Sequence, residues 1–197
     1  MLNNPSGDNA YTLGYSTYLS GSNTDTASGM TLDNKGFVYV IGITNSTDFP
    51  LAPSAGTFQS TLQGANAFFI SKVAPTSTGS NSLNFSTYFG GGFPTNGTVT
   101  GGALAVDNNA NVSNIYFTGG TNYIHTGQNS QTDFPIVNAF QPCLDTAPSN
   151  PLQTTCPTDV TLPDAFVAKL NPGTTTGAQL LYCTYLGGTG TDVGSNT

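Results

Sequence analysis

The chain has 197 residues, enough for one domain with a buried core, and 37% of them are hydrophobic. Only 7% are charged and the net charge is −7, with ten acids that are all Asp and three bases, Lys35, Lys72 and Lys169. So few cations argue against nucleic-acid binding and against anionic membrane surfaces. No apolar run approaches the roughly 18 residues of a spanning helix, and no signal peptide is visible, so we expect no membrane insertion.

One phrase recurs three times along the chain, as YSTYLSG from Tyr15, FSTYFGG from Phe85 and YCTYLGG from Tyr182. Each of the first two copies is followed by a turn rich in Asp and Asn, a β-branched and aromatic run, the motif TDFP and a last apolar run. The units are 70 and 97 residues long, so the second carries 27 extra residues, almost all after TDFP. Long repeats that each hold four short strands predict an all-β chain of propeller blades.

The predicted elements follow the repeat in chain order, with the strands of each blade named a to d. Residues 1–21 hold an orphan outer strand d around Tyr15–Leu19, and Leu2–Gly7 match the end of a strand c and its turn. Residues 22–90 form blade one, whose strand a ends at Met30–Asp33 and whose strands b to d are Phe37–Ile43, Phe69–Val73 and Leu83–Phe89. Residues 91–188 form blade two, with a loop inserted at about 122–163 and strands Ala103–Asp107, Asn114–Gly119, Ala165–Leu170 and Gln179–Leu186. Residues 189–197 begin a truncated next blade.

Several predicted strands are apolar on both faces, as in Ala165–Leu170. A blade is covered by a neighbour on each side, whereas a sheet with one wet face alternates more cleanly, so blades are favoured over a β-sandwich or a β-solenoid. Two blades and an orphan strand cannot close a ring. The chain is therefore either a fragment of a longer propeller or a homo-oligomer, in which three copies give six blades and four give eight. We favour the trimer.

The motifs of the repeat resemble a known family. The sequences at Tyr182–Gly188, Gly102–Asp107, Tyr39–Gly42, Thr47–Pro50 and Asp164–Pro172 are similar to the β-propeller repeat of bacterial surface and secreted proteins, the SBBP family. The resemblance covers nearly the whole chain except the 27-residue insertion. It implies a propeller scaffold of largely unknown activity. One departure is Cys183, which stands where the other two copies of the phrase have Ser16 and Ser86.

Most of the acids fall on one face of the predicted disc, the face that carries the b–c loops and the d–a connections. The d–a connections hold Asp25, Asn96 and Asp192, and the b–c loops hold Asp48, His125, Asp133, Cys143, Asp145, Cys156 and Asp159. Because hard cations prefer carboxylate and carbonyl oxygens, Asp25, Asp48, Asn96 and Asp133 are candidate Ca²⁺ ligands. The alternative is that the recurring Asp residues accept hydrogen bonds from turn amides.

His125 has no counterpart in the first unit, which makes it the candidate general base or metal ligand. A lone loop histidine is more often neither. No serine-hydrolase, zinc-site or nucleotide-binding pattern accompanies it in the sequence.

Cys143 and Cys156 both lie in the insertion, and a disulfide between them would close a long loop that has little core of its own. The alternative is two free thiols. A bridge implies an oxidising compartment, which with the resemblance places the protein outside the cell, on its surface or in the periplasm. Cys183, in strand d, is expected to be free and buried.

Three functions fit these features. The first is a non-catalytic binding or scaffold module of a secreted or surface bacterial propeller, with a small-molecule or glycan ligand as a possible partner besides the chain itself. The second is a Ca²⁺-dependent hydrolase of esters, lactones or phosphotriesters that uses the channel face, by analogy of fold alone. The third is a sugar-binding lectin, although the chain has no Trp to serve as a stacking platform.

Overall fold

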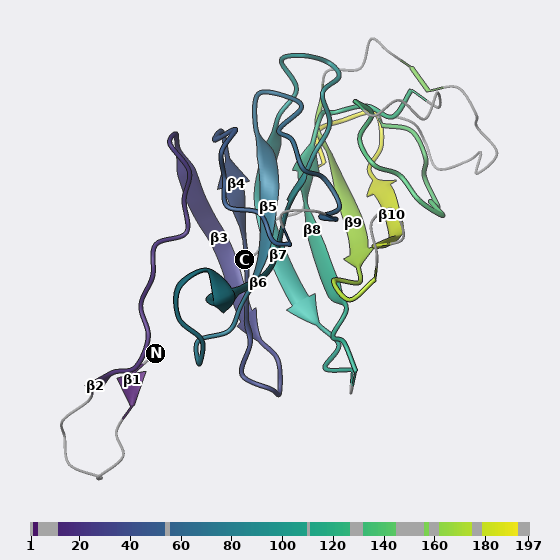
Figure 1. The fold of residues 1–197 in the computed structure, drawn as a ribbon. Helices are drawn as coiled ribbons and strands as arrows, with labels where there is room; N and C mark the ends of the chain where they lie inside the picture. The colour runs from purple at the N-terminus through teal and green to yellow at the C-terminus, as the bar shows by residue number, and fades with distance from the viewer. Residues whose placement is uncertain are drawn as a thin grey trace.

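The computed structural model describes residues 2–3, 12–53, 56–109, 111–126, 132–144, 156–157, 162–174 and 179–192. Within these residues the regular structure consists of two four-stranded antiparallel sheets, a short N-terminal hairpin and one 3-10 turn, Gly79–Ser82 (Figure 1). This all-β architecture confirms the predicted fold class of propeller-type blades, and the sheets do not close into a ring.

Each sheet is a meander in which consecutive strands pair. Blade one has the order β3-β4-β5-β6, with strands Asp25–Leu32, Val38–Thr44, Ala67–Val73 and Leu83–Phe89. Blade two has the order β7-β8-β9-β10, with strands Val99–Val106, Ile115–Thr121, Asp164–Leu170 and Leu180–Leu186. Irregularities of register recur at matching places in both sheets, once in strand a and once in strand d.

The turns between strands a and b are organised by one carboxylate each. In blade one, Asp33 Oδ1 accepts the amides of Lys35 (3.0 Å) and Phe37 (2.9 Å), and Gly36 supplies the positive φ of 83°. In blade two, Asp107 Oδ1 accepts the amides of Asn109 and Asn114. These hydrogen bonds explain why the sequence repeats Asp at the start of this turn.

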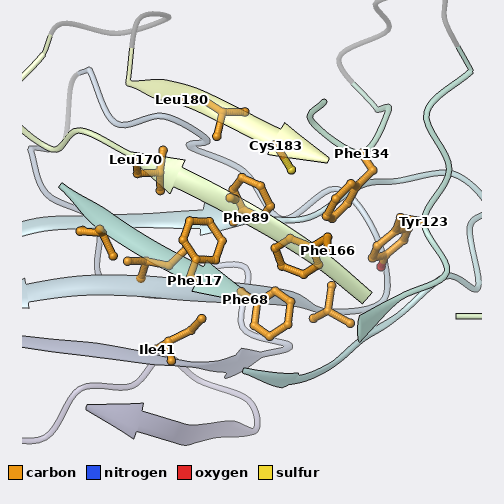
Figure 2. Packing of buried hydrophobic residues seen from close by; sticks show 14 of the residues in the cluster. Ile41, Phe68, Phe89, Phe117, Tyr123, Phe134, Phe166, Leu170, Leu180 and Cys183 are labelled. Carbon is orange, nitrogen blue, oxygen red and sulfur yellow. The ribbon is translucent and has the colours of Figure 1, made fainter. Parts of the chain in front are cut away.

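The two blades stack face to face, with β7 packed against β3 and β4. A cluster of rings from both sheets fills the space between them, as Figure 2 shows for Phe68, Phe89, Phe117 and Phe166. Phe89 lies 4.8 Å from Phe117 and 5.7 Å from Phe166 between ring centroids. The main core of the protein is therefore the interface between the blades.

The N-terminal hairpin is the tip of a preceding c–d pair. Strands β1 (Leu2–Asn3) and β2 (Thr12–Leu13) are antiparallel, with Leu2 opposite Leu13. The matching pairs of the complete blades are Val73 opposite Leu83 and Leu170 opposite Leu180. The register at Leu2 thus repeats that of both blades; residues 4–7 lie outside the described residues.

The structure does not contain the orphan strand that was predicted at Tyr15–Leu19. Residues 14–20 form no strand, and Tyr18 is 97% exposed. A strand is stabilised by backbone hydrogen bonds to a neighbouring strand, and the pairs described for the N-terminal hairpin end at Leu13. The hairpin itself stands away from both sheets (Figure 1).

Candidate functional site

The tyrosine at the fourth position of the repeated phrase forms a hydrogen bond to the b–c loop of its own blade. Tyr88 Oη donates to the carbonyl of Ser46 (2.7 Å), and Tyr185 Oη donates to the carbonyl of Tyr123 (2.8 Å). Both tyrosines are fully buried, and burial raises the pKa of each phenol. Tyr18 occupies the same place in the first copy of the phrase and is 97% exposed. The repeated tyrosine therefore has a structural role.

One glutamine in each blade, which the sequence analysis did not identify, also holds the b–c loop of its own blade in place. The backbone amides of Gln59 and Gln141 donate to Thr87 Oγ1 and Thr184 Oγ1, respectively. The side-chain Oε1 atoms of the same glutamines accept the backbone amides of Gly90 and Gly187. Both glutamines are buried. The signal was the pair Phe-Gln after each TDFP motif, at residues 58–59 and 140–141. These side chains fix the b–c loop against the end of strand d.

Asp25 and Asp48 both accept hydrogen bonds from the same d–a connection, at Gly21 and Ser22. Asp25 Oδ2 accepts hydrogen bonds from the amide of Gly21 (2.8 Å) and from Ser46 Oγ (3.0 Å). Asp48 Oδ1 accepts the amide and the hydroxyl of Ser22, which lowers the pKa of Asp48. These carboxylates join the d–a connection to the b–c loop, and Asp192 repeats the first contact at Gly188 (2.8 Å).

Asp133 is bound instead within its own loop, next to His125. Thr126 donates through its amide and its hydroxyl to the carboxylate of Asp133, and His125 Nδ1 lies 3.6 Å from Asp133 Oδ2. His125 Nδ1 is buried and has no hydrogen-bond partner among the residues that the structure describes. The structure therefore brings together the candidate base and one candidate ligand.

The described residues of one chain do not form a calcium shell. Among them no group of three or more His, Cys, Asp or Glu side chains is arranged to hold a metal ion, whereas Ca²⁺ takes six to eight oxygens. Asn96 is exposed on the d–a connection between β6 and β7, and Asp145 and Asp159 lie outside the described residues. A calcium site therefore stays a prediction.

A pocket of about 440 Å³ lies between the b–c loops of the two blades. Blade one lines it with residues 58–61, Gln63 and Gly90, and blade two lines it with His125, residues 133–137 and Leu180. Its volume falls within the roughly 300–1,000 Å³ of small-molecule sites. His125 and Asp133 thus face a cavity that could hold a ligand.

Cys143 and Cys156 form the predicted disulfide, with their Cα atoms 5.1 Å apart. Cys183 is free and fully buried, and burial raises the pKa of its thiol well above the usual value. Both expectations about the cysteines are confirmed.

The cross-strand partner of Cys183 explains its departure from the repeat. In blade one Ser86 lies opposite Ser71, and their hydroxyls are hydrogen-bonded at 2.9 Å. In blade two Cys183 lies opposite Ala168. A serine at 183 would have no such partner, so blade two has an apolar pair where blade one has a polar pair.

This pairing predicts a coupling that unfolding can measure. We expect Cys183→Ser to lower the free energy of unfolding by about 1–3 kcal/mol, because it buries an unsatisfied hydroxyl. The double variant Ala168→Ser/Cys183→Ser should recover part of that loss by restoring the pair of blade one. Urea unfolding of the two single variants and the double variant checks this, and strictly additive losses would contradict it.

Comparison with known proteins bears on the repeat. Residues 14–50 match the family model SBBP, described as a beta-propeller repeat, which confirms the expected resemblance. The match runs from the first copy of the repeated phrase through β3 and β4 to the end of the first TDFP motif. No curated protein matches the chain. In the part of the chain that the structure describes, no helix has the length and apolar character needed to cross a membrane.

Proposed function

We propose that this chain, which carries an SBBP-type beta-propeller repeat, is a non-catalytic binding and scaffold module whose blades complete a ring with those of further copies of itself. The observation that carries the proposal is a set of matched positions. Residues buried between the two blades have counterparts that are exposed on the outer faces of the same two blades.

On the outer face of blade two the counterparts are large and apolar. Tyr39 and Phe89 of blade one are fully buried against blade two. Their equivalents in blade two, Tyr116 and Leu186, are 37% and 43% exposed. Phe140, the equivalent of the partly buried Phe58, is 56% exposed.

The outer face of blade one also exposes apolar side chains, at positions whose equivalents in blade two are packed between the blades. Leu104 and Val106 of β7 pack against the core between the blades. Their equivalents in β3, Met30 and Leu32, are 62% and 48% exposed. Docking the outer face of blade two onto the outer face of blade one in another copy would repeat the internal contact. Segment 15–19, which lines a groove on that face, would have to move aside.

A head-to-tail contact of this kind closes a ring when the rotation between copies allows it. We favour three copies, which place six blades in the ring. The disulfide supports a location in an oxidising compartment, outside the cell or in the periplasm. The hydrogen bonds of Asp25, Asp48 and Asp192 support a structural role for these carboxylates, because each accepts a backbone amide of a d–a connection.

Light scattering after size exclusion tests the assembly. We expect a species with three times the 20.3 kDa mass of the single chain at micromolar concentration. Met30→Asp and Leu186→Asp, one on each outer face, should each yield monomers. Asn96→Asp adds the same charge on an exposed loop away from these apolar positions and should leave the assembly intact. A wild-type chain that stays monomeric would overturn the proposal.

A further inference from the structure

The pocket between the b–c loops is built before any ligand arrives. Gln59 Nε2 donates to the carbonyl of Thr61 (3.0 Å), which holds the wall of blade one. The backbone amide of Phe134 donates to the carbonyl of Ile124 (3.0 Å), which holds the wall of blade two. The amide of Gly92 donates to the carbonyl of Thr132 (2.7 Å) and joins the two sides. A ligand would therefore meet a largely preformed site, which reduces the entropy lost on binding.

The pocket is lined by both apolar and polar side chains. Apolar groups come from both blades, with Phe58 on one side and Pro135, Ile136 and Val137 on the other. Phe58 is held in place by stacking on Phe89 at 5.8 Å. Polar groups come from Ser60, Thr61, Gln63 and the pair of His125 and Asp133. A ligand that fits both must offer C–H surface and several hydroxyl or amide groups.

The charges of the lining residues restrict the class of ligand further. None of its lining residues is a lysine, while Asp133 contributes a carboxylate, so an anionic ligand would be repelled. The described residues hold no group of three or more acidic, His or Cys side chains that could bind a divalent cation. The ligand that suits this lining is neutral and polyhydroxylated.

His125 has a definite part in such a site. Its Nδ1 is 3.6 Å from Asp133 Oδ2, and its ring lines the pocket. An imidazole nitrogen can donate or accept a hydrogen bond. Such a ring suits a ligand hydroxyl, and the side-chain amide of Gln63 can both donate and accept.

We propose that this pocket binds a neutral saccharide of one or two residues. Phe58 and Ile136 face its C–H surface, and Gln63 and His125 bind its hydroxyls. The site lies within one chain and goes beyond the scaffold function, so it does not depend on the assembly of copies.

The experiment uses saturation-transfer NMR on the full chain with methyl glycosides of glucose, galactose, mannose and N-acetylglucosamine, and with maltose and lactose, each at about 10 mM, a concentration suited to millimolar affinities. Glucuronic acid and cyclohexanol serve as anionic and apolar controls. We expect transfer to at least one neutral sugar and little to either control. No transfer to any neutral sugar, or stronger transfer to a control, would overturn the proposal.

Variants then place the binding in the pocket. His125→Ala and Gln63→Ala should each weaken the affinity for the responding sugar by about tenfold or more, through the loss of a hydrogen bond. Asn96→Ala, on an exposed loop and not among the lining residues, should leave the affinity unchanged. Circular dichroism checks that each variant is folded. Should a pocket variant unfold, His125→Gln and Gln63→Glu provide smaller changes at the same positions. Folded pocket variants that retain full affinity would overturn the assignment.

Discussion

Replacing Phe89 with alanine is expected to lower the free energy of unfolding by about 3–5 kcal/mol, the usual loss when a large buried aromatic side chain is removed. Phe89 is fully buried. Its ring centroid lies within 6 Å of those of four other phenylalanines, Phe58, Phe117, Phe134 and Phe166. Three of these rings belong to blade two, so the substitution removes packing that holds the blades together (Figure 2). Urea unfolding monitored by circular dichroism measures the loss.

The controls for Phe89 separate the contact between blades from a general effect of truncation. Phe93→Ala removes a ring that is 39% exposed and should cost about 1 kcal/mol or less. Phe89→Leu introduces the residue that the repeat carries at Leu186, and it should cost less than the alanine variant. If Phe89→Ala lost no more stability than Phe93→Ala, the core between the blades would not be the main source of stability.

Strand d was predicted with the greatest accuracy because its signal is repeated. The phrase at Phe85 predicted Leu83–Phe89, and β6 has those bounds. For strand a, only the end was predicted in blade one, at Met30–Asp33, and the prediction for blade two, Ala103–Asp107, was too short. β3 begins at Asp25 and β7 at Val99, and both strands contain glycine, a residue with little strand propensity, at Gly29 and at Gly101 and Gly102. Their pairing with the apolar strands β4 and β8 imposes the extended form.

The error at Tyr15–Leu19 has a different cause. The local sequence is similar to that of two true strands, yet residues 14–20 form no strand. Sequence similarity within the repeat indicates what the segment would do beside a complete strand c. It cannot show that this strand is present, because the hydrogen bonds of a strand are made with a neighbour.

The candidate site was only partly predictable. The repeat topology correctly placed His125 and Asp133 in the same b–c loop, but their 3.6 Å contact depends on the path of a loop that has no counterpart in blade one. Gln59 and Gln141 were missed because they follow TDFP at different distances, nine and six residues after the proline. The pocket combines loops of two blades, and no pattern within one repeat predicts a cavity of that kind.

Removing the disulfide is expected to be the other large perturbation. The double variant Cys143→Ser/Cys156→Ser should lose about 3 kcal/mol of unfolding free energy, because the bridge spans 13 residues and restricts the unfolded chain. In the folded protein the bridge lies beside Leu144, which is fully buried in the core between the blades. The carbonyl of Cys143 also accepts a hydrogen bond from Gln141 Nε2 (3.1 Å). The bridge therefore supports the b–c loop that lines one side of the pocket.

A reductant supplies the matched test of this prediction. Dithiothreitol should shift the urea midpoint of the wild-type protein toward that of the double variant and should leave the double variant unchanged. Alkylation without reduction should label no cysteine in the native state, because the thiolate is the reactive form and burial raises the pKa of Cys183. In urea one label should appear, on Cys183. Three labels, or a wild-type midpoint that does not respond to dithiothreitol, would show that the bridge does not form in solution, and the argument for an oxidising compartment would be lost with it.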